Sequence, residues 1–188
     1  MKPCLQKKAE GSDPRAMFYA GVQCYWNNDR RRAFELLSQA MEIGLPKDRE
    51  YCSDGHSEIN AALFLVPMLI NDDDGCLSQN TEPFWFEKQS GPVGEPRKTA
   101  VIRANIRYDE LAVQRRASEY LREIFLYVTG RGGAPRDLKK AAYIAQSIVL
   151  ELSFGDRDHD PAIALRSILQ DAAAGRRIKN AAKEYPIV

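Results

Sequence analysis

Residues 13–44 read DPRAMFYAGVQCYWNNDRRRAFELLSQAMEIG and contain the signals that decide the fold. The pair Asp13-Pro14 is a typical helix start, because aspartate caps free N–H groups and proline needs no N–H partner in the first turn. Apolar and small residues then recur every three to four positions up to Asn27-Asn28. A second such run begins after Asp29 and ends at Gly44, a typical helix terminator. The stretch predicts two antiparallel helices joined by a tight turn.

The rest of the chain predicts further helices around one long irregular segment. Helical spacing recurs over 57–70, 138–152 and 161–174. Pro67 is expected to bend the first of these helices or to end it early. Residues 71–98 are rich in aspartate, glycine and proline, and a segment of this length without regular structure is often functional.

Residues 99–107 fit two different structures. Apolar and polar residues alternate there as on a strand. However, Ile102 and Ile106 also continue at helical spacing through Val113 as far as Val128. We favour one long helix, because the later part of this segment has an unambiguous helical pattern.

The composition is that of an ordinary globular protein. Of 188 residues, 44% are hydrophobic and 28% are charged, which is too apolar for a disordered chain. The formal net charge of +1 provides no overall field for a nucleic acid or an anionic membrane. The best apolar run, 61–70, is about half as long as a bilayer-spanning helix and contains Pro67. We therefore expect neither a nucleic-acid partner nor insertion into a membrane.

Cysteine spacing and the N-terminal residues bear on the compartment. The four cysteines, Cys4, Cys24, Cys52 and Cys76, lack the paired spacing of a zinc site. We expect free thiols, with Cys24 in a helix core; the alternative is a Cys52–Cys76 disulfide in an oxidising compartment. Residues 1–8 are followed by no apolar segment, which predicts a cytoplasmic location, or a periplasmic one if a signal segment has been removed.

The sequence predicts no metal ion and no cofactor. The acidic run 156–160 begins like a calcium loop, but Pro161 and Ser167 stand where an EF-hand needs glycine and glutamate. The simpler interpretation is that Asp160 caps a helix that begins at Pro161. Residues 72–75, three aspartates and a glycine, are expected to form a solvated turn. Phosphate-loop, dinucleotide and nucleophile-elbow motifs are absent from the sequence.

Charge is distributed unevenly along the chain. Residues 47–82 contain eight acidic and two basic side chains, whereas residues 97–122 contain seven basic and three acidic ones. The two stretches could face each other within one fold or lie on separate solvated faces. Alternatively, they form a polarised surface that steers a charged protein partner.

Two stretches resemble a known repeat family. Residues 32–44, RAFELLSQAMEIG, resemble the second helix of a Sel-one-like repeat, a relative of the tetratricopeptide repeat, through their basic–alanine pair, second alanine and closing glycine. Residues 127–141, YVTGRGGAPRDLKKA, are similar to the tyrosine, glycine-x-glycine turn, aspartate and lysine–alanine sequence of that family. The resemblance implies stacked helical hairpins, a short α-solenoid whose concave face receives a protein segment.

The expected fold class is therefore a mainly α, single helical-repeat domain with an irregular insertion. Its parts are the first hairpin over 12–44, a third helix plus insertion over 45–107, a second repeat hairpin and following helix over 108–174, and a C-terminal tail over 175–188.

The candidate partner-binding residues lie in three places. Consecutive aromatic residues in the insertion cannot all face one core, so at least one is expected to be exposed or covered by a partner, unless the insertion plugs a groove between helices. The predicted set comprises Tyr19, Gln23 and Trp26 on the first helix, Phe84, Trp85 and Phe86 in the insertion, and Arg103 and Arg107 in the basic stretch.

These observations favour a non-catalytic module that binds another protein. The resemblance implies a bacterial immunity protein that neutralises a secreted toxin or effector, or alternatively an adaptor within a bacterial complex. An alternative of a different class is a hydrolase that uses Asp54, His56, Asp73 and Asp74 of the loops. In the leading interpretation no residue has a catalytic role.

Overall fold

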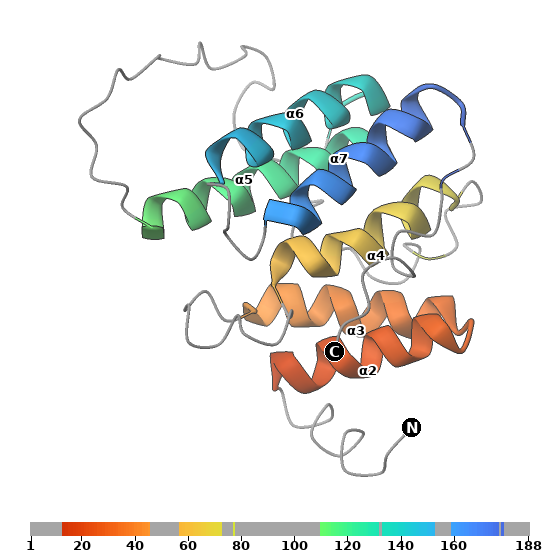
Figure 1. Cartoon of the computed structure of the whole chain (residues 1–188). Helices are drawn as coiled ribbons and strands as arrows, with labels where there is room; N and C mark the ends of the chain where they lie inside the picture. Colours follow the sequence, from red (N-terminus) through yellow and green to blue (C-terminus); the bar gives the residue numbers. More distant parts are fainter. Residues whose placement is uncertain are drawn as a thin grey trace.

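The part of the chain that the structure describes is predominantly helical. The computed structural model describes residues 13–45, 57–72, 77, 110–131, 133–152, 159–176 and 178, with the side chains of residues 110–118 excepted. Within these ranges the elements are six helices and no strands (Figure 1): α2 (Pro14–Trp26), α3 (Arg30–Ile43), α4 (Glu58–Ile70), α5 (Glu110–Thr129), α6 (Leu138–Glu151) and α7 (His159–Ala173). The prediction of a mainly α chain with helix-on-helix packing is confirmed; the stacking of hairpins as repeats stays a prediction.

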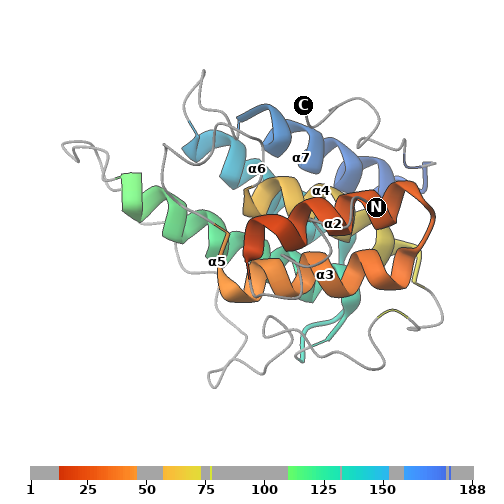
Figure 2. The ribbon, with the colours of Figure 1, turned by 90° about the horizontal axis from the view of Figure 1, so that it is seen from below.

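Helices α2 and α3 form the predicted hairpin, and Figure 2 shows them side by side nearest the viewer. The Asp13 carboxylate accepts a hydrogen bond from the Arg15 N–H at 3.1 Å, and the Asp29 carboxylate accepts one from the Arg32 N–H at 3.2 Å. Both aspartates therefore cap helices as predicted. Between the helices Asn28 has a φ of 63°, a left-handed conformation that asparagine tolerates and that reverses the chain.

Close contact between α2 and α3 depends on Gly21. A Cβ atom at this position would lie 2.8 Å from Leu37 Cγ and 3.3 Å from Leu36 Cβ, inside van der Waals contact. Leu37 is fully buried, so it has little room to retreat. The absence of a side chain at Gly21 thus sets how near the two helices come.

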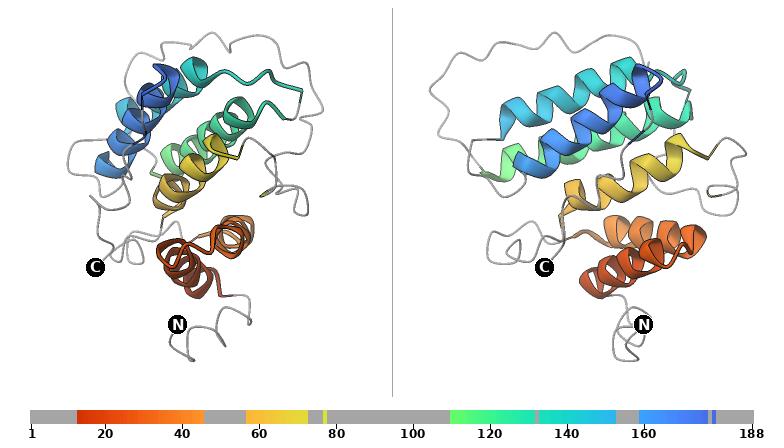
Figure 3. Two further views of the ribbon diagram at one scale, coloured as in Figure 1. Left: turned by 90° about the vertical axis from the view of Figure 1, so that its right-hand side faces the viewer. Right: turned by 45° about the vertical axis from the view of Figure 1, so that its right-hand side comes forward.

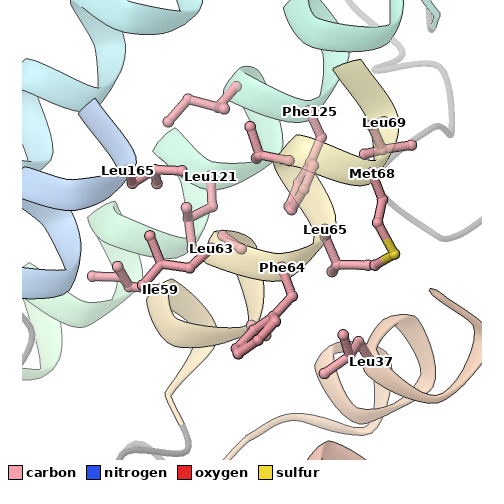
Figure 4. Packing of buried hydrophobic residues seen from close by; sticks show 14 of the residues in the cluster. Leu37, Ile59, Leu63, Phe64, Leu65, Met68, Leu69, Leu121, Phe125 and Leu165 are labelled. Carbon is pink, nitrogen blue, oxygen red and sulfur yellow. The ribbon is translucent and has the colours of Figure 1, made fainter. Parts of the chain in front are cut away.

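Helix α4 lies at the centre, between the α2–α3 hairpin and the layer formed by α5, α6 and α7 (Figure 3). Every residue from Ile59 to Ile70 is buried. Figure 4 shows Leu37 of α3 on one side of α4, and Phe125 of α5 and Leu165 of α7 on the other. A helix that is apolar around its whole circumference is stable in water only when it is enclosed in this way.

Helix α4 continues through Pro67 to Ile70, so the early end, one of the two outcomes expected at this proline, is not observed; the last carbonyls of the helix accept hydrogen bonds from side chains. Pro67 has no N–H to donate to the preceding turn. The Asn71 side-chain amide donates to the Pro67 carbonyl at 2.8 Å, and the Arg136 guanidinium donates to the Ile70 carbonyl at 2.9 Å. The second of these bonds ties the α5–α6 connection to the end of the central helix.

The connection between α5 and α6 contains the glycine turn seen in the sequence. Gly130 and Gly133 have φ values of 71° and 84°, in the left-handed region that favours glycine. A Cβ atom on Gly130 would also lie 3.1 Å from the Arg136 backbone nitrogen. Beyond the turn, the Asp137 carboxylate accepts from the Lys140 N–H at 3.0 Å and caps α6. The turn and cap together allow α6 to fold back along α5.

Polar side chains join the three helices of this layer. The Tyr120 hydroxyl donates to the Glu151 carboxylate at 2.9 Å and links α5 to α6. The Arg166 guanidinium donates to the Gln146 side-chain oxygen at 2.8 Å and links α7 to α6.

The start of α7 differs from the prediction. The helix begins at His159, so Asp160 lies within its first turn and does not cap it. Pro161 does not mark the start because the N–H groups of the first turn have no helical partner, and proline loses nothing by lacking one there. Residues 99–107 and the greater part of 71–98 lie outside the described residues.

We predict that Gly21→Ala lowers the free energy of unfolding by about 1–3 kcal/mol, because the added methyl group overlaps Leu37. Urea denaturation followed by circular dichroism measures this change. Leu37→Ala removes the atoms that the new methyl group would overlap. The loss of stability in the double variant, Gly21→Ala with Leu37→Ala, is therefore expected to be smaller than the sum of the two single losses. Gln39→Ala on the exposed face of α3 is the control, with a change within about 0.5 kcal/mol. Unchanged stability of Gly21→Ala would contradict the assignment.

We also predict that Phe64→Ala costs about 3–5 kcal/mol of folding free energy. The Phe64 ring is 2% exposed and lies edge-on to the rings of Phe18 and Tyr25, at 6.5 and 5.2 Å between centroids. Its removal would separate the central helix from the hairpin. Ile43→Ala is a matched control, because Ile43 is 50% exposed. Equal stability losses in the two variants would show that Phe64 does not join the layers.

Candidate functional site

The three candidate residues on α2 differ in their exposure. Tyr19 is half-buried, and its ring lies edge-on to that of Phe18 with centroids 5.6 Å apart. Gln23 is also half-buried, and its side-chain oxygen is covered and has no hydrogen-bond partner. Trp26, the last residue of the helix, is 45% exposed. Trp26 is therefore the most exposed of the three residues.

The other sequence candidates lie outside the described residues. The structure gives no placement for any member of the aromatic insertion, of the basic pair or of the alternative catalytic set, nor for the cysteines of the alternative disulfide. These residues are Phe84, Trp85, Phe86, Arg103, Arg107, Asp54, His56, Asp73, Asp74, Cys52 and Cys76.

Beside Trp26 the surface is hollowed into a cleft of about 220 Å³, which we name the Trp26 cleft. It lies where the α2–α3 turn meets the C-terminal half of α4. Its lining residues come from both segments: Tyr25, Trp26, Asn28, Arg30, Pro67, Met68 and Asn71.

The geometry of the α2–α3 turn places one wall of this cleft. The Asp29 N–H donates to the Cys24 carbonyl at 2.9 Å, and the Asn28 N–H donates to the Tyr25 carbonyl at 3.0 Å. These bonds close a turn so short that Trp26, at the end of α2, and Arg30, at the start of α3, reach the same cleft. The turn therefore brings an aromatic and a cationic side chain together.

The wall residues are held from behind by the core. The Tyr25 ring lies between Trp26 and Phe64, with centroids 5.8 and 5.2 Å away and near-perpendicular planes. Pro67 and Met68 belong to the buried helix α4, and their positions are set by its packing. The cleft is thus built on rigid elements, which keeps its shape fixed before anything binds.

The three consecutive arginines at the start of α3 differ in their bonding partners. Arg31 and Arg32 both contact the Glu35 carboxylate, at 3.5 and 3.1 Å. Arg30 is exposed, and no residue within the described ranges forms a hydrogen bond or an ion pair with it. It is the one charged side chain among the seven that line the cleft. Arg30 is therefore available for a negatively charged group.

The residue types that line the cleft are those of protein interfaces. None of the seven carries a carboxylate, an imidazole or a thiol, the usual general acids, bases and nucleophiles. Tryptophan, tyrosine, methionine and arginine are instead the residue types enriched in protein–protein interfaces. The arrangement can hold an apolar group against its aromatic walls and an anion at Arg30.

Potential metal ligands do not gather in the described part of the chain: no group of three or more histidine, cysteine, aspartate or glutamate side chains is placed to hold a metal ion there. The His159 imidazole has only Asp160 beside it, with Nδ1 3.7 Å from the carboxylate. The Asp72 carboxylate accepts from the Leu77 N–H at 3.1 Å and so stabilises the backbone. Among the helices of the same ranges, none has both the length and the apolar character that crossing a membrane requires.

Cys24 lies in the helix core, as predicted, and is a free thiol. Burial raises the pKa of this thiol, and the neighbouring Asp29 carboxylate raises it further. The protonated form is the weaker nucleophile and the weaker metal ligand. Cys24 is therefore a packing residue next to the α2–α3 turn.

A second exposed apolar face, on α6, was missed by the sequence analysis. Tyr143 and Leu150 are each 74% exposed. They stand seven residues apart on the side of the helix away from the buried Ala141, Ala145 and Ile148. Separating the apolar residues of 138–152 by helical phase would have identified both as lying off the buried stripe.

No protein-family model, no curated protein and no solved structure matches this chain. The resemblance of residues 32–44 and 127–141 to Sel-one-like repeats accordingly stays an interpretation of the sequence.

We predict that Cys24 makes the protein less stable at alkaline pH. Above about pH 8.5 the unfolded thiol releases its proton, whereas the folded thiol, with its raised pKa, retains it. The free energy of unfolding therefore falls as the pH rises through this range, and this contribution is constant at lower pH. Cys24→Ala is expected to flatten the decline in urea denaturation between about pH 8 and 10. Parallel profiles for the variant and the wild-type chain would contradict this.

Proposed function

We propose that this protein is a non-catalytic module that binds another protein through the Trp26 cleft. The observation that carries the proposal is that Trp26, 45% exposed, stands at a cleft of about 220 Å³. Tryptophan in a pocket is the residue type with the largest share of binding energy in protein interfaces. Burial of its ring by a partner would remove a large apolar surface from water.

The support of the cleft by the core favours tight recognition. The turn and the central helix hold Tyr25 and Met68 in place. Binding a partner would therefore cost little conformational entropy at these side chains. The chemistry of the lining points the same way, because Arg30 offers a strong hydrogen-bond donor but no proton-transfer group.

For the identity of the partner we propose a secreted toxin or effector that this chain neutralises. The support comes from the resemblance to Sel-one-like repeats, a family whose bacterial members include immunity proteins. The runner-up is a subunit of a bacterial complex for which the chain is an adaptor. Both roles use the same binding surface and differ in what the partner does alone.

We predict that the partner captured by the tagged full chain from its native source is lost when Trp26 is replaced by alanine. A hot-spot tryptophan contributes at least about 2 kcal/mol, so the affinity is expected to fall at least about thirtyfold. Quantitative mass spectrometry of the captured proteins and the affinity of the purified pair measure this loss. Trp26→Ala should leave stability within about 1 kcal/mol of the wild type, because the residue is half exposed.

Tyr143→Ala is the matched control, since Tyr143 is also an exposed aromatic residue on a helix but lies on α6. Capture that is equal for Trp26→Ala and the wild type would exclude the cleft as the binding surface. Expression of the captured partner in a heterologous host then distinguishes the two roles. Growth inhibition that is relieved by the wild-type chain, but not by Trp26→Ala, supports neutralisation; a partner without toxicity supports the adaptor.

A further inference from the structure

We infer that the Trp26 cleft recognises a peptide segment in which a large apolar side chain stands next to a carboxylate. This inference rests on the proposed function and specifies the chemistry of the partner. It combines the shape of the cleft with the one charge that lines it.

The apolar half of the inference follows from the walls of the cleft. Trp26 and the half-buried Tyr25 present ring surface to the cleft, on which an apolar group packs well, whereas Pro67 and Met68 are buried and contribute little exposed surface. A volume of about 220 Å³ corresponds to about seven water molecules, which is room for one large side chain but not for a helix. The occupant is therefore a single large apolar side chain of the partner segment.

The anionic half follows from Arg30. Its guanidinium is exposed and has no bonding partner among the described residues, whereas the two following arginines share Glu35. A guanidinium can bind a carboxylate through two parallel hydrogen bonds, a geometry that favours carboxylate over a neutral amide. An anchor residue seated against Trp26 would bring a carboxylate one or two residues further along the segment near Arg30, which lines the same cleft; in an extended segment the second following side chain shares the face of the anchor.

Among the described residues, the acidic side chains nearest to the lining in the sequence, Asp29 and Asp72, form other hydrogen bonds. The Asp29 carboxylate accepts from the Arg32 N–H at 3.2 Å, and the Asp72 carboxylate accepts from the Leu77 N–H at 3.1 Å. Both side chains are thus engaged with the backbone, and neither lines the cleft. The charge that a partner meets in the cleft is that of Arg30.

Tryptophan fluorescence tests the inference directly. The chain has two tryptophans, so Trp85→Phe leaves Trp26 as the single emitter in the full-length protein. The probes are three capped pentapeptides with a central phenylalanine, followed by aspartate and glutamate, by asparagine and glutamine, or by two lysines. We expect the acidic peptide to change the Trp26 emission and to bind about tenfold more tightly than its amide counterpart, with the lysine peptide weakest.

Substitutions at neighbouring arginines provide the matched comparison. Arg30→Gln is expected to weaken the acidic peptide about tenfold and to abolish its advantage over the amide peptide. Arg31→Gln, which removes the same charge one residue away, should change the affinity by less than about twofold. Arg30→Glu should reverse the order of the acidic and lysine peptides. Isothermal titration of the unsubstituted chain, with Trp26→Ala as the blank, repeats the measurement without the Trp85 substitution.

Two results would overturn the inference. One is equal affinity for the acidic and amide peptides; the other is no binding of the acidic peptide at concentrations up to about 1 mM. If either occurs while capture of the cellular partner still depends on Trp26, the proposed function stands and only the chemistry of the segment is wrong. If capture is also independent of Trp26, the proposed function fails as well.

Discussion

Helix α4 has apolar side chains around its whole circumference, so water must be excluded from every side of it. The α2–α3 hairpin covers one side, and the layer of α5, α6 and α7 covers the other. Each of these two units is amphipathic and would expose its own apolar face without α4 between them. The enclosure of α4 therefore determines where the other five helices of the described part of the chain lie.

The Trp26 cleft is a consequence of this enclosure. Covering α4 brings the α2–α3 turn against the last turns of the central helix, where Pro67 and Met68 lie. The close approach at Gly21 and the reversal at Asn28 then bring Trp26 and Arg30 to one opening. The buried residues behind the cleft set its shape. The exposed residues supply the binding chemistry, and replacing them is expected to change the free energy of unfolding only slightly.

Local signals were the most predictable part of the fold. Asp13, Asp29 and Gly44 delimit their helices because capping and left-handed termination depend on a few neighbouring residues. The departure at Asp160 is local as well, because the first turn of α7 tolerates proline without a cap immediately before it. By contrast, the Ile70 carbonyl at the end of α4 accepts a hydrogen bond from Arg136, 66 residues away in the chain, which no local signal indicates.

The candidate site was predictable only in part. Trp26 was predicted together with Tyr19 and Gln23, as the helix face that the repeat resemblance implies to be concave, and its role in binding stays a prediction. Tyr25, Arg30 and Met68 could not be assigned to the same site, because no local pattern relates residue 26 to residue 68. The sequence by itself determined the helices, their caps and the apolar character of α4, since these depend on neighbours along the chain. The tertiary structure alone decided how the helices enclose α4 and which residues of the α2–α3 turn meet its C-terminal end at the cleft, because packing joins segments that the chain keeps far apart.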